Sequence, residues 1–153
     1  MKEKMTAGDF CNRFVTVAER RMSVDRAAQF MREHHVGSLV VTDTIGAGKL
    51  VVGILTDRDI VTSVVAKGVD PKKLTVEDVM SRDVVTSLES DTLMDVLSNM
   101  RRKGIRRVPI VSLQGTLQGL ITLDDMIEIL AEQMQSLVMA INSEQIRERS
   151  MKT

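Results

Sequence analysis

The stretch GILTDRDI at residues 53–60 and the stretch GLITLDDM at residues 119–126 share one arrangement. Each begins with a glycine and a short aliphatic run, and each carries an aspartate three residues after a threonine: Asp59 follows Thr56, and Asp125 follows Thr122. An aliphatic run that ends in a hydroxyl residue, with an acidic residue three positions later, is typical of a strand that passes directly into a helix. The sequence therefore predicts the same strand-to-helix transition twice.

A helix and a strand are predicted before each of these stretches. Ser23 and Thr92 are residues of the type that caps helix N-termini, and the apolar residues after each have the i, i+3, i+4, i+7 spacing of a helix with one buried face. The predicted buried positions are Val24, Ala27, Ala28 and Met31 in the first copy and Leu93, Val96, Leu97 and Met100 in the second. The strands SLVV at 38–41 and RVPIV at 107–111 follow, and Pro109 favours the edge or the start of a strand.

The second strand of each copy leads into a second amphipathic helix. The predicted strands are 49–56 and 116–122, and Gly53 and Gly119 inside them would let a ligand or a neighbouring strand approach the backbone closely. The predicted buried positions of the helices are Ile60, Val61, Val64 and Val65 in the first copy and Met126, Ile127, Leu130 and Ala131 in the second. One such unit buries too little apolar surface by itself, so we expect the two units to pack sheet against sheet.

The predicted fold class is α/β, more specifically α+β: two β-α-β-β-α repeats with pseudo-two-fold symmetry and a C-terminal helical extension. We assign residues 8–66 to the first repeat, 67–83 to a linker with a short helix, 84–132 to the second repeat and 133–153 to the extension. The last helix carries an apolar stripe of Ile127, Leu130, Met134, Leu137 and Ile141, longer than one small unit needs. The stripe favours contact with a second chain, with packing on its own domain as the alternative.

Composition and charge argue against several classes of protein. The 153 residues include 21 basic and 21 acidic side chains, so no overall field attracts the chain to nucleic acid or to an anionic membrane. It has no apolar run of bilayer length and no signal peptide pattern, which predicts a cytoplasmic protein. The lone Cys11 and the adjacent His34 and His35, which would point about 100° apart on a helix, do not suggest a metal site. Since no catalytic constellation accompanies the aspartates, we predict no catalytic residues and no enzyme activity.

The repeated threonine and aspartate can bind a sugar phosphate. Thr56 and Thr122 would lie where backbone N–H groups and the helix dipole favour an anion. Asp59 and Asp125 can accept both hydrogen bonds of a ribose diol. The alternative is that both pairs only cap helices, because threonine at the N-cap with aspartate in the first turn occurs in many helices that bind no ligand.

Taken in order, these segments resemble a tandem pair of CBS domains, often called a Bateman module. The blocks VVTS, SDTLMDVLSNMRRKGIRRVPIV and LQGLITLDDMIEIL, with the weaker partners FVTV, MSVDRAAQFMREHHVGSLVV and VVGILTDRDI, carry the resemblance over residues 8–132. Ordered blocks that match twice in register are specific, whereas T-x-x-D alone is common by chance. The resemblance implies two β-α-β-β-α units that bind adenine nucleotides in the clefts between them.

The resemblance also implies which residues form each cleft, with ribose and phosphate contacts from one repeat and most adenine contacts from the other. The Asp59 cleft would combine Thr56, Asp59, Val85, Thr86 and Ile105, and the Asp125 cleft would combine Thr122, Asp125, Val15, Thr16 and Val36. The apolar members would sandwich the base, and the backbone around Val85 would read its edge. This alignment leaves one more residue between Thr16 and Val24 than between Thr86 and Leu93.

A neutral chain that binds a phosphate needs a local cluster of positive charge. The segment MRRKGIRRV at 100–108 supplies one, and the resemblance implies a phosphate contact from Arg107, with Arg106 beside it and Arg58 as a further candidate. In the first repeat, Gly37 and Ser38 stand at the equivalents of Arg106 and Arg107. The first repeat therefore offers less positive charge for a phosphate, unless a histidine or a second chain supplies it.

We therefore predict a stand-alone, energy-sensing regulatory module that binds an adenine nucleotide and signals through the geometry of a homodimer. AMP is the first choice of ligand, and ADP, ATP, NAD and S-adenosylmethionine share its adenosine part. A separate effector protein would receive the signal. The alternative is a structural interaction module that dimerises through its helices and binds no physiological nucleotide.

Overall fold

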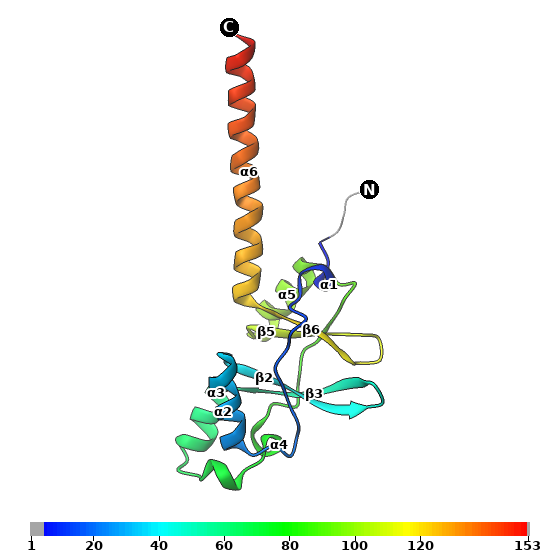
Figure 1. Ribbon diagram of the computed structural model, residues 1–153, viewed down its shortest axis with the longest axis vertical. Coiled ribbons are helices and arrows are strands. Elements are labelled where there is room, and N and C mark those ends of the chain that lie inside the picture. The colour runs from blue at the N-terminus through cyan, green and yellow to red at the C-terminus, as the bar shows by residue number, and fades with distance from the viewer. Residues whose placement is uncertain (1–4, 153) are drawn as a thin grey trace.

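The computed structural model describes residues 5–152 and contains the same five-element unit twice (Figure 1). The first repeat comprises β1 (Val17–Ala18), α2 (Val24–His34), β2 (Ser38–Ile45), β3 (Gly48–Thr56) and α3 (Asp57–Ile60), which continues as the π-helical turn η1 (Val61–Val65). The second comprises β4 (Ser87–Leu88), α5 (Leu93–Lys103), β5 (Arg107–Val111), β6 (Leu117–Thr122) and α6 (Leu123–Met151). The remaining elements are α1 (Ala7–Phe10), η2 (Pro71–Lys73) and α4 (Val76–Val79). The predicted α+β pair with a C-terminal helix is confirmed.

Each repeat forms a three-stranded sheet in which the second strand is central. β2 is parallel to β1 and antiparallel to β3, and β5 is parallel to β4 and antiparallel to β6. The two hairpins lie one above the other in Figure 1, and they meet where the N–H of Val51 donates to the carbonyl of Gly115 (3.2 Å). Aliphatic residues of the central strands, such as Leu39 and Ile110, are fully buried.

A threonine with an aspartate three residues later caps five helices among the described residues, including α1, where the N–H of Asp9 donates to Oγ1 of Thr6. Reciprocal capping boxes form between Thr56 and Asp59, between Thr92 and Asp95, and between Thr122 and Asp125. At the start of α4, the N–H of Thr75 donates to Asp78 (2.9 Å), and this hydrogen bond lowers the pKa of the Asp78 carboxyl. A T-x-x-D segment in this chain is therefore first a helix cap, and only its position in the fold distinguishes a binding site.

The buried faces of α2 and α5 follow the predicted spacing, but the predicted faces of the second helices are partly wrong. Six of the eight positions predicted on α2 and α5 are buried, and Ala28 and Leu97 are half-buried. On the second helices, the predicted residues that prove exposed are Val61, Val65, Ile127, Leu130 and Ala131. Ile129, which was not predicted, is buried. Regular spacing identifies an apolar stripe, but it does not say whether the sheet or another surface covers that stripe.

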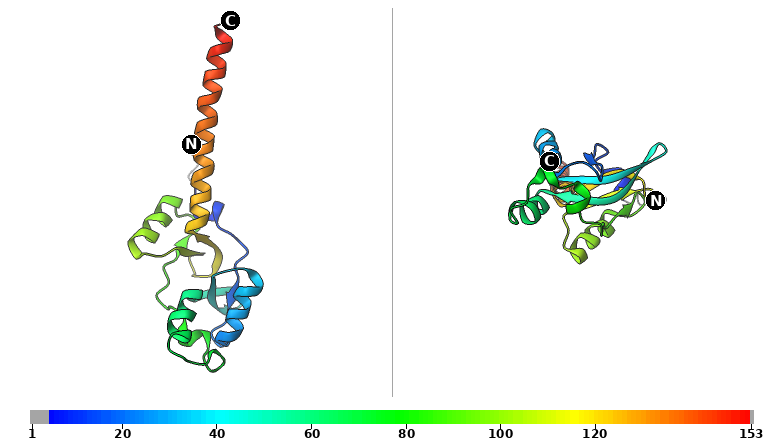
Figure 2. Two further views of the ribbon diagram at one scale, coloured as in Figure 1. Left: turned by 90° about the vertical axis from the view of Figure 1, so that its left-hand side faces the viewer. Right: turned by 90° about the horizontal axis from the view of Figure 1, so that it is seen from below.

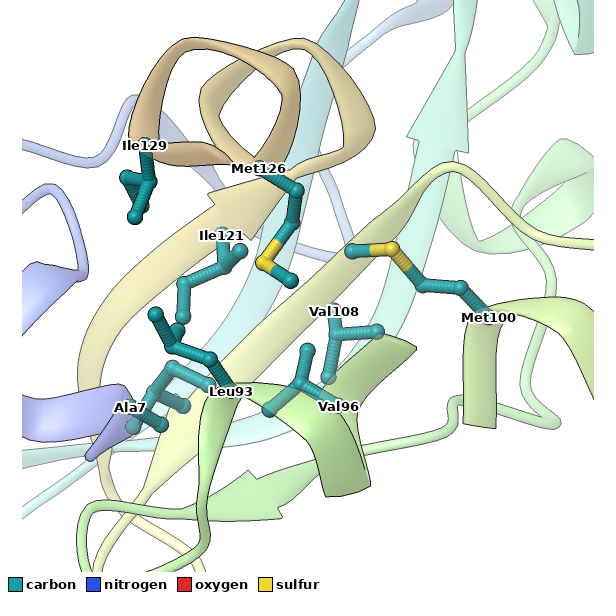
Figure 3. Packing of buried hydrophobic residues seen from close by; sticks show 9 residues of the cluster. Ala7, Leu93, Val96, Met100, Val108, Ile121, Met126 and Ile129 are labelled. Atoms are coloured by element: carbon teal, nitrogen blue, oxygen red, sulfur yellow. The ribbon is translucent and has the colours of Figure 1, made fainter. Parts of the chain in front are cut away.

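The short helix α1 precedes the first repeat but packs on the second. The short helix α4 precedes the second repeat but packs on the first. Ala7 of α1 lies in the core of the second repeat with Leu93 and Val96, as Figure 3 shows, and Val76 of α4 lies in the core of the first. Equivalent hydrogen bonds hold both: the N–H of Ala7 donates to the carbonyl of Asp91 (2.7 Å), and that of Val76 donates to the carbonyl of Met22 (2.8 Å). The two repeats are thus tied together by an exchange of segments.

The repeated glycines make room for these exchanged segments. A β carbon on Gly53 would lie 3.0 Å from the carbonyl oxygen of Ser81, and one on Gly119 would lie 3.0 Å from that of Asn12 and would collide with Cys11. The neighbouring backbone therefore requires glycine at both positions. Burial raises the pKa of the Cys11 thiol.

The C-terminal helix α6 leaves the two repeats as a straight rod (Figures 1 and 2). Met126 and Ile129 are buried in its first two turns, and from Ala131 onward every described residue is exposed. The stripe that continues from Ile127 includes Met134 and Leu137, each 66% exposed. Among residues 5–152 no helix combines the length and the apolarity that a membrane span needs.

Candidate functional site

A pocket lies where the two repeats meet, beside the first turn of α6. Its walls come from the segment before β1, the connection from α2 to β2, strands β5 and β6, and the start of α6. The residues that line it are Asn12, Phe14, Val15, Thr16, Val36, Gly37, Ser38, Arg107, Leu120, Thr122 and Asp125. The structure therefore brings together all five side chains predicted for the Asp125 cleft. The pocket has a volume of about 220 Å³.

Asp125 is held in this pocket by the cap of α6. The N–H of Thr122 donates to Oδ2 of Asp125 (3.0 Å), and the N–H of Asp125 donates to Oγ1 of Thr122 (3.1 Å). Thr122 and Asp125 therefore do cap a helix, as the alternative interpretation expected. The cap uses only Oδ2, and Oδ1 accepts no hydrogen bond from any residue that the structure describes. A carboxylate that is fixed in this way can present its second oxygen to a ligand, so capping and binding do not exclude each other.

Arg107 supplies positive charge to the same pocket. It begins β5, pairs with Thr122 across the sheet and is half-buried. Its Nη2 lies 3.0 Å from the position that a β carbon on Gly37 would take, and Oδ2 of Asp57 lies 3.1 Å from that position. No residue within 5–152 forms an ion pair or a side-chain hydrogen bond with Arg107.

The other two predicted phosphate contacts lie elsewhere. The side chain of Arg106 is 66% exposed and lies 3.5 Å from Oδ1 of Asp124, beside a different pocket. Arg58 is exposed on α3. Of the three arginines, Arg107 is the one that lines the pocket at Asp125.

The residues predicted for the Asp59 cleft lie on several elements of both repeats. Thr56 and Asp59 form the same reciprocal cap, at 2.9 and 3.1 Å. Val85 and Thr86 lie just before β4. Ile105 packs against the core of the second repeat and lines an apolar pocket of about 520 Å³ between α5 and the start of α6. The Asp59 cleft therefore stays a prediction.

The alignment behind the predicted adenine contacts equates Thr16 with Thr86. The strand pairing in the structure shifts this equivalence by one residue. Ala18 pairs with Val41 and Ser87 pairs with Ile110, where Val41 and Ile110 each lie opposite the repeated glycine. Counting back from these pairs, Thr16 is equivalent to Val85 and not to Thr86. A single offset of 69 residues then relates both segments.

Pro109 lies in the middle of β5, the central strand of its sheet, so the prediction of an edge or a strand start is wrong. The equivalent Val40 donates its N–H to the carbonyl of Thr16 (3.2 Å). Proline has no N–H to donate, so the carbonyl of Val85 lacks this partner. Thr16 and Val85 both lie just outside the two-residue strands β1 and β4. The free carbonyl of Val85 is able to accept a hydrogen bond from a ligand.

Sequence reasoning missed several residues of the pocket at Asp125. Phe14 is 94% exposed at its rim, and Asn12 and Leu120 are joined there by two backbone hydrogen bonds (2.9 and 3.0 Å). Gly37 and Ser38 also line it. A signal for Phe14 was present, since it is one of only three phenylalanines in a chain without Trp or Tyr.

The arrangement is suited to binding a small organic ligand. Within the described residues, no three His, Cys, Asp or Glu side chains lie close enough to hold a metal ion. His34 is exposed and stacks on Phe30, with ring centroids 4.7 Å apart. A carboxylate oxygen, a helix N-terminus, a guanidinium and apolar walls together suit a ligand that combines hydroxyls, an anion and a flat ring.

Two repeated units with such a pocket between them form a paired module. The sequence comparison agrees with the fold, because the CBS domain family matches residues 7–66 and 76–132. The chain belongs to the CBS-domain family.

Three similar proteins illustrate this relationship. Hypoxic response protein 1 of Mycobacterium tuberculosis is 34% identical over 127 residues, which is 83% of this chain and 86% of the relative. The crystal structure of an uncharacterized conserved protein from Pyrococcus horikoshii has a TM-score of 0.73 at 30% identity and covers 84% of this chain and 94% of that one. The CBS domain pair of protein MJ0100, solved in complex with 5′-methylthioadenosine and S-adenosyl-L-methionine, has a TM-score of 0.71 at 25% identity, covering 82% and 99%.

Proposed function

We propose that the chain is a regulatory module that binds an adenosine-containing ligand between its repeats. The observation that carries this proposal is the single pocket that unites Asp125 and Thr122 with Arg107 and with the apolar side chains of Val15 and Val36. In the proposed complex, Oδ1 of Asp125 accepts from the ribose hydroxyls, the base lies against the apolar wall, and the phosphate lies between the first turn of α6 and Arg107. The adenosine ligands named for the MJ0100 structure support this choice.

AMP is the proposed first choice, because the pocket contains a cation with no partner of its own. Arg107 is half-buried, so an anion next to it would gain more than on an open surface. ADP, ATP and NAD also carry phosphate beside adenosine, whereas the sulfonium of S-adenosylmethionine would be repelled by Arg107. Phosphorylated adenosines are therefore favoured over S-adenosylmethionine.

The proposed role is to transmit the presence of the ligand to a separate effector protein through the geometry of a homodimer. CBS pairs are generally regulatory and not catalytic, and we propose no enzyme activity for this one. The proposed dimer contact is the apolar surface of α5 and α6, which includes Met94 at the pocket between these helices and the exposed stripe from Ile127 to Ile141. Sedimentation analysis at micromolar concentration should give a dimer, and a monomer would remove this part of the proposal.

Calorimetry with purified, ligand-stripped protein tests the binding proposal. AMP, ADP, ATP, NAD, S-adenosylmethionine and adenosine are titrated separately, and AMP should release heat with a defined stoichiometry. The absence of heat with all six would overturn the proposal. Mass spectrometry of small molecules released from the protein as purified is an independent check, which should recover an adenosine-containing compound.

A second candidate is a structural interaction module that binds no nucleotide. The observation that favours it is the completeness of the caps, because Thr56 with Asp59 and Thr122 with Asp125 fulfil a structural role without any ligand. This candidate predicts dimerisation in the absence of every adenosine ligand tested and no heat in the calorimetric titrations.

A further inference from the structure

Phe14 is the most exposed of the large hydrophobic side chains that the structure describes, at 94%. An isolated exposed apolar side chain needs no explanation by itself. Phe14 differs because it borders two adjacent pockets, and one of them contains Asp125, Thr122 and Arg107.

The backbone on both sides of Phe14 is anchored, so the ring is presented at a fixed place. Asn12 exchanges two backbone hydrogen bonds with Leu120 of β6 (2.9 and 3.0 Å), and its Oδ1 accepts the N–H of Phe14 (3.0 Å). Two residues later, the carbonyl of Thr16 accepts from the N–H of Val40 (3.2 Å). The segment is therefore tied to the second repeat before Phe14 and to the first repeat after it.

The two pockets beside Phe14 have complementary character. The pocket at Asp125 has a volume of about 220 Å³, below the roughly 300–1,000 Å³ usual for small-molecule sites. The adjoining pocket, of about 350 Å³, shares Phe14, Val15 and Thr16 with it and adds Phe30 and His34. The two pockets therefore adjoin along Phe14, with Asp125 and Arg107 on one side and the rings of Phe30 and His34 on the other. A nucleotide has the same division between sugar phosphate and flat base.

We propose that the base of the bound ligand stacks on Phe14, and that this contact makes the Asp125 cleft the tighter of the two inter-repeat clefts. The inference rests on the proposed function and adds to it an asymmetry between the clefts. The backbone bridge between Asn12 and Leu120 is equivalent to the one between Ser81 and Ile54. Asp83 follows Ser81 by two residues, as Phe14 follows Asn12, so Asp83 is the counterpart of Phe14 in the other cleft. A carboxylate offers no stacking face and repels phosphate. The two clefts therefore differ in both base and phosphate recognition.

Calorimetry of Phe14→Ala with AMP provides the first test. Loss of one base–aromatic contact should weaken the tightest class of sites by roughly 5- to 100-fold. Leu113→Ala is the matched control, because Leu113 is 85% exposed and lies outside both pockets, and its affinity should equal that of the unchanged protein. Equal AMP affinity in Phe14→Ala and the unchanged protein would overturn the stacking proposal while the proposed function stands. If the unchanged protein binds no adenosine ligand, both proposals fail.

Fluorescence gives a second readout that does not depend on the stability of the variant. The chain has no Trp or Tyr, so Phe14→Trp introduces a single fluorophore at the cleft, and Leu113→Trp introduces one at the control position. Stacking on the base should quench the emission of Phe14→Trp as AMP saturates the cleft and leave Leu113→Trp unchanged. Emission that stays constant in Phe14→Trp, while calorimetry of the same variant shows binding, would overturn the proposal.

Discussion

The guanidinium of Arg107 occupies the space that a side chain on Gly37 would need, with Nη2 only 3.0 Å from the place of the missing β carbon. Gly37 belongs to the first repeat and Arg107 to the second. The residue equivalent to Gly37 in the second repeat is Arg106, because Ser38 and Arg107 lie at equivalent ladder positions. The pocket at Asp125 thus combines a glycine of the first repeat with an arginine of the second, so its positive charge comes from the same chain.

Replacing Arg107 by glutamine should therefore separate the recognition of phosphate from that of adenosine. A charge-assisted hydrogen bond contributes about 1.5–3 kcal/mol, so AMP should bind roughly 10- to 100-fold more weakly to Arg107→Gln. Adenosine, which has no phosphate, should bind as before. Arg102→Gln is the control, because Arg102 is exposed on α5 and donates to Oδ1 of Asn99. An equal loss for AMP and adenosine would contradict the proposed role of Arg107.

Gly53→Ala should destabilise the protein without changing any ligand contact. The new β carbon would lie 3.0 Å from the carbonyl oxygen of Ser81, on the segment that the first repeat holds through two backbone hydrogen bonds. Overpacking of this kind costs about 1–3 kcal/mol in the free energy of unfolding, which urea denaturation measures. Gly119→Ala should behave alike because Asn12 and Cys11 crowd it in the same way. Unchanged unfolding midpoints would show that the exchanged segments are loosely held.

Ser87→Ala should leave stability unchanged or raise it by up to about 1 kcal/mol. Ser87 is buried, and its hydroxyl has no hydrogen-bond partner among the residues that the structure describes. The equivalent position in the first repeat is occupied by Ala18, which offers the reciprocal experiment. Ala18→Ser should destabilise by about 1–3 kcal/mol, since it would bury a hydroxyl in an apolar core. Thermal melts of both variants check the pair, and a marked loss of stability in Ser87→Ala would reveal a hidden partner of the hydroxyl.

Arg20 should contribute to stability at neutral pH and lose that contribution in acid. Its guanidinium donates to Asp43 (2.9 Å) and lowers the pKa of that carboxyl, while Arg82 and then Arg20 lower the pKa of Glu77. A carboxyl whose pKa is lower in the folded state stabilises the fold fully above its unfolded pKa of about 4, and this stability is lost as pH falls through the folded value.

The melting temperatures of Arg20→Gln and the unchanged protein should therefore differ at pH 7 and converge near pH 3. Arg26→Gln, which removes an exposed pair with Glu33, is the control and should change little at either pH. A difference of the same size at both pH values would mean that Arg20 acts through packing and not through charge.

Local pattern was sufficient to predict the repeated elements of this fold, whereas the residues expected around Asp125 came from the family resemblance. Helix spacing from Val24 and from Leu93, and the threonine caps at Thr56 and Thr122, are properties of short segments. The same pattern did not reveal that Ile127 is exposed, because periodicity is identical for a stripe that faces the sheet and for one that faces solvent.

What the sequence did not predict depends on contacts between distant residues. The exchange of α1 and α4 between the repeats rests on a few side chains, Ala7 and Val76 among them, that have no local signature. Placing Arg107 beside Gly37 required the packing of one repeat on the other. Pro109 lies in the middle of a central strand, which the local rule for proline did not anticipate.

The binding of AMP to Asp125→Ala and to Asp95→Ala, measured in parallel by calorimetry, tests the central claim most directly. Both variants lose a reciprocal helix cap and should lose about 1 kcal/mol of stability, but only Asp125 lines the pocket. We predict that Asp125→Ala binds AMP at least roughly 10-fold more weakly than the unchanged protein, and that Asp95→Ala binds it equally well. Equal AMP affinity in both variants would contradict a ligand site at Asp125 and leave its carboxylate as a helix cap alone.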